Sequence, residues 1–455
     1  MDIFDLIIVG SGSGNSIPDY MSDWKIALVE RGIFGGTCLN VGCIPSKMFV
    51  LPATLASEAR HGARLGINSR VDSVDWPAIR DRVFGLIDPI AEGGREYRAT
   101  GSPNVEFISG TARFTGDRTF DVDGRIISAP KVLLAAGSRP WIPPIEGLDS
   151  VRSHTSDSIM RLDELPARLA VLGGGAIAVE LGHVFSGYGS EVTLYNRSNI
   201  LVRAEDPDIS QRFTEVFANR VNLRLGGLPD RVEQVGDVIR IHRGDEMIEV
   251  DEVLVAVGRE PNSDLLGTEA GGVLLKPNGR IKTDDTMATG AEGVWAIGDI
   301  TNDFQLKHVA NAEAKVAFWN IANADDQRKV DLRFVPHATF SHPQMAGVGM
   351  SEPDAVEAGK NFVVGMRDFG STAYGWALDD KTSFFKVLID SDTGLILGAH
   401  AIGPEAAILV QPMIQAMQFG ETAERVANEV FYIHPALIEV VENALLDGLE
   451  KLVDS

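Results

Sequence analysis

Two segments of this chain each place a run of apolar residues directly before a glycine-rich turn. The first is "FDLIIVGSGSGNSI", close to the N-terminus, and the second is "RLAVLGGGAIAVELG", which begins at Arg168. An apolar strand followed by closely spaced glycines is typical of a βαβ unit whose backbone approaches the pyrophosphate of a dinucleotide. A chain of 455 residues is too long for one hydrophobic core, so several domains are expected. Two of them are predicted to bind dinucleotides.

In the first unit, Gly10 and Gly12 supply the tight turn, and Gly14 follows closely. Asn15 occupies the third position of the fingerprint, where glycine is usual. The next strand, "KIALVE", ends at Glu30, where an acid binds the ribose hydroxyls. We expect a helix directly after the turn, with its N-terminus stabilising the bound phosphates.

The second unit matches the fingerprint fully, with Gly173, Gly175 and Ala178 in the three positions. Its next strand ends at Asn196, where an NAD-binding domain usually carries an acid for the ribose 2′-hydroxyl.

Two arginines, Arg197 and Arg203, follow that strand end. Arginine binds a 2′-phosphate through charge-assisted, often bidentate hydrogen bonds. The alternative is that both are ordinary solvated surface charges. Because the acid is missing, the pattern favours NADP(H) over NAD(H).

All the cysteine of the chain stands in "GGTCLNVGCIPSK", as Cys38 and Cys43. Pro45 suits the first turn of a helix, so we expect the Cys43 sulfur at a positive helix end, which favours the reactive thiolate. A structural zinc site needs four ligands, and no second cysteine pair or histidine cluster stands nearby in the sequence. Two interpretations remain, a redox pair that cycles between dithiol and disulfide and a chance pairing of two cysteines. A nicotinamide hydride reaches sulfur through a flavin, so FAD is expected in the first unit and NADPH in the second.

The charge and the hydropathy pattern bear on partners. The formal net charge is −23, with 41 basic against 64 acidic residues, which argues against nucleic acid or an anionic membrane as a partner. The start, "MDIFDLIIVG", has no basic region and only a short apolar run, and we expect no stretch to approach the ~18 apolar residues of a membrane span. We expect a cytoplasmic protein without a membrane partner. In that reducing compartment a structural disulfide is disfavoured.

One of the nine histidines stands out as a possible acid/base. His434, in "FYIHPALIEVV", precedes a proline at a helix start and has Glu439 five positions on. A carboxylate that orients an imidazole and stabilises its cation is the usual support for a histidine base. The alternative is a surface or capping residue. His308, His337 and His342 lack such a partner spacing and are assigned structural roles.

Taken in order, "GGTCLNVGCIPSK", the two fingerprints, "AIGDIT" and "HPALIE" resemble the pyridine nucleotide-disulfide oxidoreductases of the glutathione reductase and dihydrolipoamide dehydrogenase type. The resemblance covers essentially the whole chain. It implies an α/β fold with two Rossmann-like dinucleotide-binding domains plus a C-terminal α+β dimerisation domain. The expected segments are the FAD-binding domain in 1–145 and 265–332, the NADPH-binding domain in 146–264, and the dimerisation domain in 333–455. The helical segment 46–102 is interpreted as an excursion from the first domain.

The resemblance implies a role for each thiol. Cys38 would attack the substrate and form the mixed disulfide, and Cys43 would lie against the flavin as the charge-transfer thiolate. Lys47 and Glu180 would form the ion pair beside flavin N5.

The resemblance also implies the remaining roles. His434 with Glu439 would be the acid/base dyad, contributed by the other subunit of a homodimer. Asp299 would bind the sugar portion of FAD. Further cofactor contacts are expected at Gly36, Thr37, Gly137, Gly258 and Gly298.

Three positions depart from the family pattern. Asn15 replaces the third glycine, Ala176 stands where many relatives have a tyrosine that covers the flavin, and Tyr20 stands where glutathione reductases have an arginine for the substrate carboxylate. The last departure disfavours anionic glutathione and suits a sugar-based thiol, as does the similarity of "IIVGSGSGNSI" and "GTCLNVGCIPSKMFV" to members that act on one.

The leading hypothesis is therefore an NADPH-dependent flavoprotein that reduces a small-molecule disulfide. Alternatives are an NAD-dependent dihydrolipoamide dehydrogenase and another NADPH-disulfide reductase such as glutathione reductase. A mercuric reductase is disfavoured because the chain lacks a second cysteine pair near its C-terminus. A flavoprotein that is only a structural component, with vestigial thiols, would not require the cysteine pair together with His434 and Glu439.

Overall fold

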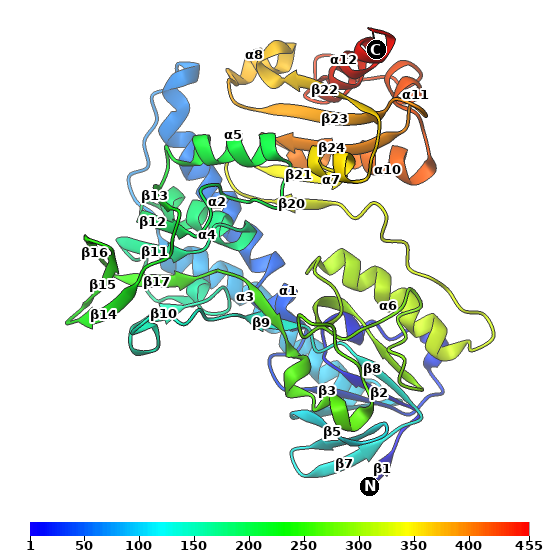
Figure 1. The fold of residues 1–455 in the computed structure, drawn as a ribbon. Helices are drawn as coiled ribbons and strands as arrows, with labels where there is room; N and C mark the ends of the chain where they lie inside the picture. The colour runs from blue at the N-terminus through cyan, green and yellow to red at the C-terminus, as the bar shows by residue number, and fades with distance from the viewer. Residues whose placement is uncertain (455) are drawn as a thin grey trace. The chain divides into compact units, whose positions relative to one another are not determined.

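The computed structural model describes residues Met1–Asp454, and the chain forms two compact units. Unit 1 contains Met1–Ser46, Ala78–Trp141 and Gly258–Leu332. Unit 2 contains Lys47–Pro77, Ile142–Val257 and the chain from Arg333 on. Segments far apart in the sequence therefore build each unit, and the colours of Figure 1 show this mixing.

The centre of unit 1 is a sheet of five parallel strands. In spatial order they are β19 (Val294–Ala296), β8 (Lys131–Leu134), β2 (Leu6–Val9), β3 (Ile26–Glu30) and β4 (Val105–Ser109). The inner strands are almost continuously apolar because both faces of a parallel sheet are covered.

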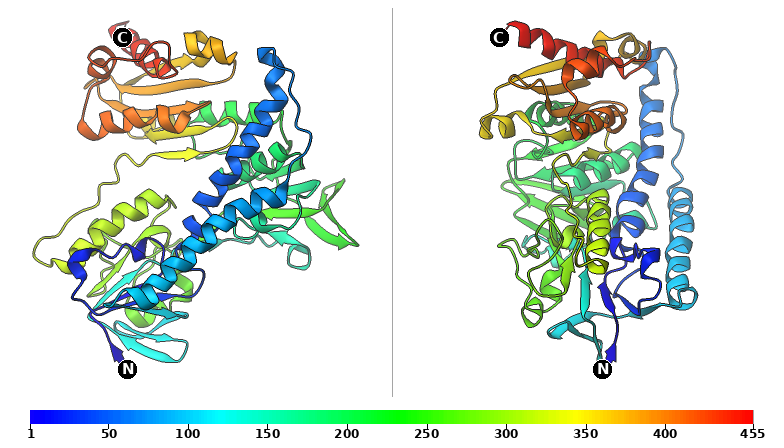
Figure 2. Two further views of the ribbon diagram at one scale, coloured as in Figure 1. Left: turned by 180° about the vertical axis from the view of Figure 1, so that it is seen from behind. Right: turned by 90° about the vertical axis from the view of Figure 1, so that its right-hand side faces the viewer.

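The two faces of this sheet pack against different layers. Ile7 and Val9 of β2 belong to a core shared with a small sheet, whereas Leu6 and Ile8 pack with Phe318 of α6 (Lys307–Ala322). This alternation is the period of two that a strand imposes on its side chains. Figures 1 and 2 show α6 on one side of the sheet and the small sheet on the other.

The remaining elements of unit 1 are short, apart from one long helix. The strands of the small sheet lie in the order β1 (Asp2–Ile3), β7 (Arg125–Ser128), β6 (Thr119–Val122) and β5 (Ala112–Gly116). A separate pair is formed by β9 (Ser138–Pro140) and β18 (Arg259–Pro261). Besides α6, the helices of unit 1 are α1 (Gly36–Asn40) and most of α3 (Trp76–Glu96).

Unit 2 contains a second parallel sheet. Its strands lie in the order β10 (Ser153–His154), β17 (Glu252–Val255), β11 (Arg168–Leu172), β12 (Glu191–Asn196) and β13 (Asn222–Leu225). The helices of this part of unit 2 are α4 (Ala176–Tyr188), α5 (Pro207–Phe217) and most of α2 (Cys43–His61). A separate antiparallel sheet consists of β14 (Arg231–Val235), β15 (Val238–Arg243) and β16 (Glu246–Val250).

The C-terminal part of unit 2 is an antiparallel sheet with helices. The strands lie in the order β20 (His337–Thr339), β21 (Met345–Gly349), β24 (Ile396–Ile402), β23 (Phe384–Asp390) and β22 (Phe362–Asp368), and the helices are α7 (Glu352–Glu357), α8 (Ala373–Leu378), α9 (Ala406–Leu409), α10 (Gln411–Phe419), α11 (Ala423–Asn428) and α12 (Glu439–Asp454). Helix α12 approaches β22 closely because Gly365 has no Cβ, which would lie 2.0 Å from the Ala444 carbonyl oxygen. The predicted fold class, two Rossmann-like domains and a C-terminal α+β domain, is confirmed. The predicted segment boundaries stay predictions.

The prediction of a helix directly after the first glycine turn is wrong. A single 3₁₀ turn, Ser13–Asn15, follows the glycines, and a second, Asp19–Met21, precedes β3. Pro18 lacks a backbone N–H, and the segment "SGSGNSIPDYMSD" offers turn-forming residues without a helical apolar period. The first crossover is therefore a loop, whereas α4 is a full helix in the second unit.

One helical stretch, Gly36–Leu65, is long and apolar enough to cross a membrane by length and composition alone. The expectation that no stretch approaches this length is wrong for this segment. The stretch contains α1 and α2, which are separated at Val41, whose φ of −143° is not helical. Core helices of globular proteins pass the same test, so this finding is a weak indication.

Candidate functional site

The first glycine turn lies against the start of α1. Gly10 has a φ of +108°, and a Cβ there would lie 2.3 Å from the Ala135 carbonyl oxygen. Gly36 has a φ of +74°, and its Cβ would lie 2.8 Å from the Cα of Gly12. Any side chain at Gly36 would therefore push the thiol-bearing helix away from the turn. Thr37, the next residue, is exposed.

Glu30 holds this turn at the end of β3. Its Oε2 accepts hydrogen bonds of 2.8 Å from both the backbone N–H and the hydroxyl of Ser11, and its Oε1 accepts one of 2.8 Å from the Gly32 N–H. The Ser11 hydroxyl also accepts a hydrogen bond from the Gly35 N–H at 2.9 Å. The acid expected to bind ribose thus also orients the turn.

The two thiols are free cysteines on successive helices. Cys38 lies in α1 and is half-buried, whereas Cys43 begins α2 and is exposed. A hydrogen bond with Cys43, followed in size by burial, raises the pKa of the Cys38 thiol above its ordinary value. The two thiols are therefore in hydrogen-bond contact, as the spacing predicted.

The predicted Asp299 contact lies in a network within unit 1. The Ser138 hydroxyl donates to Asp299 Oδ2 at 2.7 Å, and Arg259 Nε donates to the Ser138 hydroxyl at 2.9 Å. The backbone N–H of Gly298 donates to Glu313 Oε2 at 2.6 Å. Burial raises the pKa of Glu313 to about 7.

Sequence reasoning missed Arg259 and Glu313. Glu313 is the only acid in α6, which was a usable signal. The glycines predicted to contact the cofactor here, Gly137, Gly258 and Gly298, all have positive φ. Gly14 is buried between Ala135 and Ile8.

Lys47 and Glu180 form the predicted ion pair inside unit 2. Lys47 Nζ lies 2.8 Å from Glu180 Oε2 and 4.8 Å from the centre of the Phe340 ring. The backbone N–H of Phe340 donates to Glu180 Oε1 at 2.7 Å. The carboxylate of Glu180, which is almost fully buried, is thus satisfied on both oxygens.

The second glycine turn also packs closely against its neighbours. Gly173 has a φ of +127°, and a Cβ there would lie 2.1 Å from the Ala256 carbonyl oxygen. Gly175 faces open space, since no atom lies within 4 Å of an added Cβ. Helix α4 begins at the next residue and runs for 13 residues, with Ala178 buried in its first turn. A phosphate at this helix N-terminus would be stabilised by unpaired N–H groups.

The loop after β12 is fixed against this second turn. Asn196 Nδ2 donates to the Ser198 and Ile200 carbonyls, and the Val202 N–H donates to the Gly174 carbonyl at 2.7 Å. The loop carries Arg197 and Arg203, both exposed, and neither pairs with a carboxylate within Met1–Asp454.

The far end of the same loop is tied to the C-terminal sheet. Glu205 Oε2 lies 2.7 Å from His337 Nε2, and Asp206 Oδ1 accepts a hydrogen bond from Lys386 Nζ at 2.7 Å. Lys386 is fully buried and also binds Asp208. The position of the arginine loop is therefore determined at both ends.

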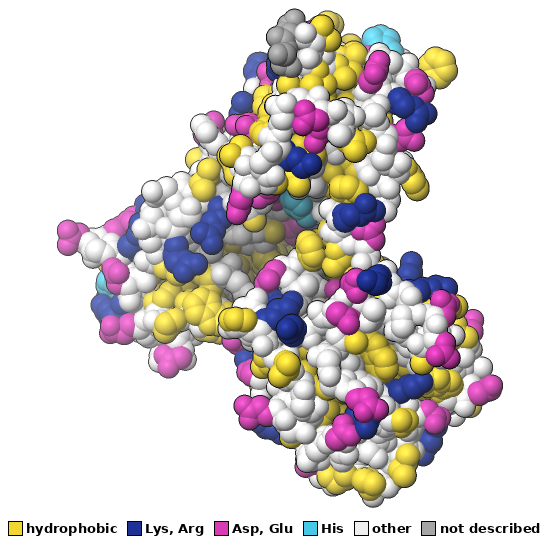
Figure 3. Space-filling view, turned by 45° about the vertical axis from the view of Figure 1, so that its right-hand side comes forward, with side chains coloured by type: hydrophobic (Ala, Val, Ile, Leu, Met, Phe, Trp, Pro, Cys, Tyr) yellow, Lys and Arg dark blue, Asp and Glu magenta, His cyan; other side chains and the backbone are white. Residues whose placement is uncertain are grey.

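His434 and Glu439 form the predicted dyad. His434 Nδ1 lies 2.7 Å from Glu439 Oε1, and the imidazole is 72% exposed. Phe431 and Ile433 beside it are also exposed. Figure 3 shows hydrophobic side chains on the surface of the C-terminal part of unit 2.

Two other histidines have carboxylate partners that sequence spacing did not reveal. His337 pairs with Glu205, and His342 Nε2 lies 3.2 Å from Glu58 Oε1. Each partner comes from more than 130 residues away, so the spacing around these histidines does not reveal it. Their contacts join elements of unit 2, so the structural assignment remains a prediction.

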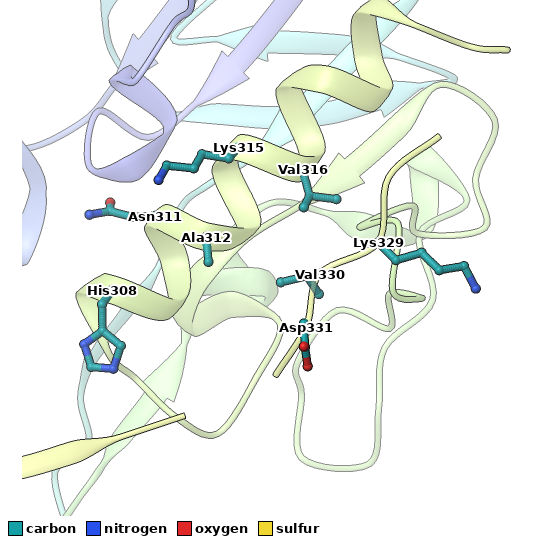
Figure 4. Close-up of a pocket in the computed structure, with 8 residues that line it drawn as sticks. All are labelled: His308, Asn311, Ala312, Lys315, Val316, Lys329, Val330 and Asp331. Atoms are coloured by element: carbon teal, nitrogen blue, oxygen red, sulfur yellow. The ribbon is translucent and has the colours of Figure 1, made fainter. Parts of the chain in front are cut away.

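His308 lines a groove of about 440 Å³ in unit 1. Figure 4 shows Ala312 and Val316 on α6 facing the segment that contains Val330, whereas the side chains of Asn311 and Lys315 extend away from it. None of the predicted site residues lines it. Within Met1–Asp454, no three His, Cys, Asp or Glu side chains gather to hold a metal ion.

Comparison with known proteins gives a consistent result. The family model described as "Pyridine nucleotide-disulphide oxidoreductase" matches residues 4–314, and the model of that family's dimerisation domain matches residues 335–445. The chain is 43% identical to mycothione reductase of Mycobacterium tuberculosis over 98% of this chain and 99% of that one. It is 33% identical to a mercuric reductase of Staphylococcus aureus, over 92% and 78%, and 32% identical to dihydrolipoyl dehydrogenase of Corynebacterium glutamicum, over 97% and 97%. A solved structure, the Cu(II) complex of the HOCl-induced flavoprotein disulfide reductase RclA from Escherichia coli, has the same fold, with a TM-score of 0.87 at 24% identity over 99% of this chain and 100% of that one.

Proposed function

The chain belongs to the pyridine nucleotide-disulphide oxidoreductase family, whose members are enzymes, and we propose that it reduces mycothione to mycothiol with NADPH through FAD and the Cys38/Cys43 pair. The observation that carries this proposal is the hydrogen-bonded thiol pair, with Cys38 on a helix, α1, that starts beside the first glycine turn. A dinucleotide site and a dithiol in contact range are what the transfer of electrons to a disulfide requires.

The reaction at sulfur uses this chain's own residues. Cys38 gives its thiol proton to His434 of the partner subunit and attacks one substrate sulfur. The substrate S–S bond breaks, a mixed disulfide forms, and the first thiol leaves with the proton that His434 received. Cys43 then attacks the Cys38 sulfur, forms the Cys38–Cys43 disulfide and releases the second thiol. FAD, once bound, would carry two electrons from NADPH to that disulfide.

The residues present fit FAD at the first turn. Gly10 packs against the Ala135 carbonyl and Gly12 lies against Gly36, and neither carries a side chain that would separate the backbone from a pyrophosphate. Glu30 ends the next strand, where it would bind the ribose, and Asp299 would bind the sugar portion. Lys47 and Glu180 would form the ion pair beside N5 of the flavin ring.

NADPH is supported by the second turn. Open space at Gly175 and the N-terminus of α4 suit a pyrophosphate, and the two unpaired arginines lie on a loop bonded to Gly174. An NAD-dependent dihydrolipoamide dehydrogenase is less well supported, because Asn196 offers no carboxylate to a 2′-hydroxyl.

A homodimer with a shared active site is supported by the matched dimerisation domain and by the exposure of His434 beside Phe431 and Ile433. Mycothione as the substrate is supported by the similarity to mycothione reductase and by Tyr20 at the position of the glutathione-binding arginine. The cytoplasmic location stays a prediction.

The coenzyme assignment is tested by Arg197→Met and Arg203→Met. Each variant is expected to raise KM for NADPH about 10- to 100-fold, the size expected for loss of a charge-assisted hydrogen bond to phosphate, with the kinetics for NADH unchanged. Arg240→Met is the matched control, because Arg240, on β15 of the same unit, pairs with Glu249 on β16. Equal losses for NADPH and NADH would show that the arginines support the loop rather than bind a 2′-phosphate.

A further inference from the structure

The first glycine turn lacks the helix that normally supports a bound pyrophosphate. Helix α4 follows the second turn for 13 residues, but only the three-residue 3₁₀ turn Ser13–Asn15 follows the first. A turn of three residues has neither the aligned peptide dipoles nor the row of free N–H groups of a helix N-terminus. If the first unit binds a dinucleotide, another source of positive charge is required there.

Two cationic side chains contact this turn from other elements. Lys307, the first residue of α6, donates from Nζ to the Ser13 hydroxyl at 2.9 Å. Arg98 donates from Nε to Asn15 Oδ1 at 2.8 Å and from Nη2 to the Asn15 carbonyl at 3.1 Å. Asn15, the unusual third residue of the fingerprint, is therefore the acceptor that Arg98 uses.

Neither cation is neutralised by protein. Within Met1–Asp454, no carboxylate pairs with Lys307 or Arg98, whereas nearby Arg95 pairs with Glu92 and Lys329 pairs with Asp285. The chain has a net charge of −23, yet the positive charges of these two side chains at one turn are not balanced by a carboxylate of the described residues. They are therefore available to attract a bound anion.

The charge of Lys307 also acts on the Cys38 thiol. The Ser13 hydroxyl that it contacts lies 3.0 Å from Asn311 Oδ1. The hydrogen bond with Cys43 and burial dominate the raised pKa of Cys38, and the charge of Lys307 acts against them in the lowering direction. Its ammonium group is therefore close enough to influence α1, where the turn and the thiol helix meet.

We propose that Lys307 binds the pyrophosphate of FAD at the first glycine turn in place of a crossover helix, and that Arg98 is a positioning residue that holds the turn through Asn15. This inference rests on the proposed function, which assigns FAD to unit 1. Arg98 acts through hydrogen bonds to the turn itself, so its role is geometric. Lys307 acts through its charge.

The test is the affinity of the purified holoenzyme for FAD, measured by flavin release and rebinding over a range of NaCl concentrations. Lys307→Met and Lys307→Gln are expected to bind FAD about 10- to 100-fold more weakly, with a flatter salt dependence, because one cation–phosphate contact is lost. Lys307→Arg is expected to stay within about threefold of the wild type. Arg98→Met is expected to weaken binding while leaving the salt dependence as in the wild type.

Controls separate contact from general charge. Lys315→Met removes an exposed lysine on the same helix, about 12 Å further along α6, and Arg95→Met removes the paired arginine near Arg98. Both are expected to bind FAD like the wild type. NADPH binding to the same samples, together with thermal unfolding, identifies variants that have lost their fold.

The outcomes are distinguishable. Wild-type protein that binds no FAD overturns the proposed function. Wild-type protein that binds FAD while Lys307→Gln binds it equally well overturns only the role of the Lys307 charge, because glutamine can keep a hydrogen bond to Ser13. Equal weakening in Lys315→Met would assign the effect to long-range charge and would also overturn the inference.

Discussion

Cys38→Ser is expected to abolish turnover of the disulfide substrate while the reduced enzyme keeps the long-wavelength absorbance of a thiolate beside flavin. Serine at position 38 cannot form a mixed disulfide, so turnover should fall by at least about 10⁴-fold. Its hydroxyl can still form a hydrogen bond with the Cys43 sulfur, in place of the bond between the two thiols. The Cys43 thiolate should therefore remain.

Cys43→Ser is expected to lose both properties. The absorbance needs a thiolate at position 43, and turnover needs a second thiol to resolve the mixed disulfide. The measurement is an anaerobic absorbance spectrum of each variant after reduction, together with steady-state turnover.

This pair of variants is decisive because exposure alone favours the opposite assignment. Cys43 is the more exposed thiol, and Cys38 is half-buried with a raised pKa. An attacking thiol is expected to be accessible and readily ionised. If Cys43→Ser kept the absorbance and Cys38→Ser lost it, the two roles would have to be exchanged.

His434→Gln is expected to slow the disulfide half-reaction about 10²- to 10⁴-fold and to leave reduction of the flavin by NADPH unchanged. The dyad geometry is in place, with Nδ1 bonded to Glu439 and the rest of the imidazole exposed. Its proposed role is to protonate the leaving thiol, and this protonation is not part of hydride transfer from NADPH to the flavin. Rapid mixing of each half-reaction separately measures the two rates.

His242→Gln is the matched control for this variant. His242 also pairs with a carboxylate, at 2.9 Å from Glu233, and is partly exposed. No change in either half-reaction is expected. If His434→Gln slowed flavin reduction as much as disulfide reduction, the acid/base assignment would fail.

The sequence predicted features that depend on neighbours in the chain. Both glycine turns could be identified because Gly10 and Gly173 have positive φ and approach the backbone of a neighbouring strand, which only glycine allows. The contact between Cys38 and Cys43, and that between His434 and Glu439, follow from separations of five residues.

Features that depend on distant partners could not be predicted in the same way. The pairs of His337 with Glu205 and of Lys386 with Asp206 join residues more than 130 positions apart, and only the packed sheet brings them together. Recognition of the family supplied the pair of Lys47 and Glu180, which spacing alone does not indicate.

The missing crossover helix was the main structural error. A fingerprint that begins a βαβ unit predicts a helix, but the residues from Ser13 to Pro18 are suited to turns, and the proline lacks an N–H. The local propensity of these residues, taken alone, predicts a loop, in conflict with the helix that the fingerprint predicts. The same departure at Asn15 directs attention to Arg98 and Lys307.

The most direct test of the central claim is steady-state oxidation of NADPH and of NADH by the purified flavoprotein, each with mycothione, oxidised glutathione and lipoamide as acceptors. The account predicts a clear preference for NADPH with mycothione. Preference for NADH with lipoamide would contradict it, because Arg197 and Arg203 would then be surface charges and the protein a dihydrolipoamide dehydrogenase.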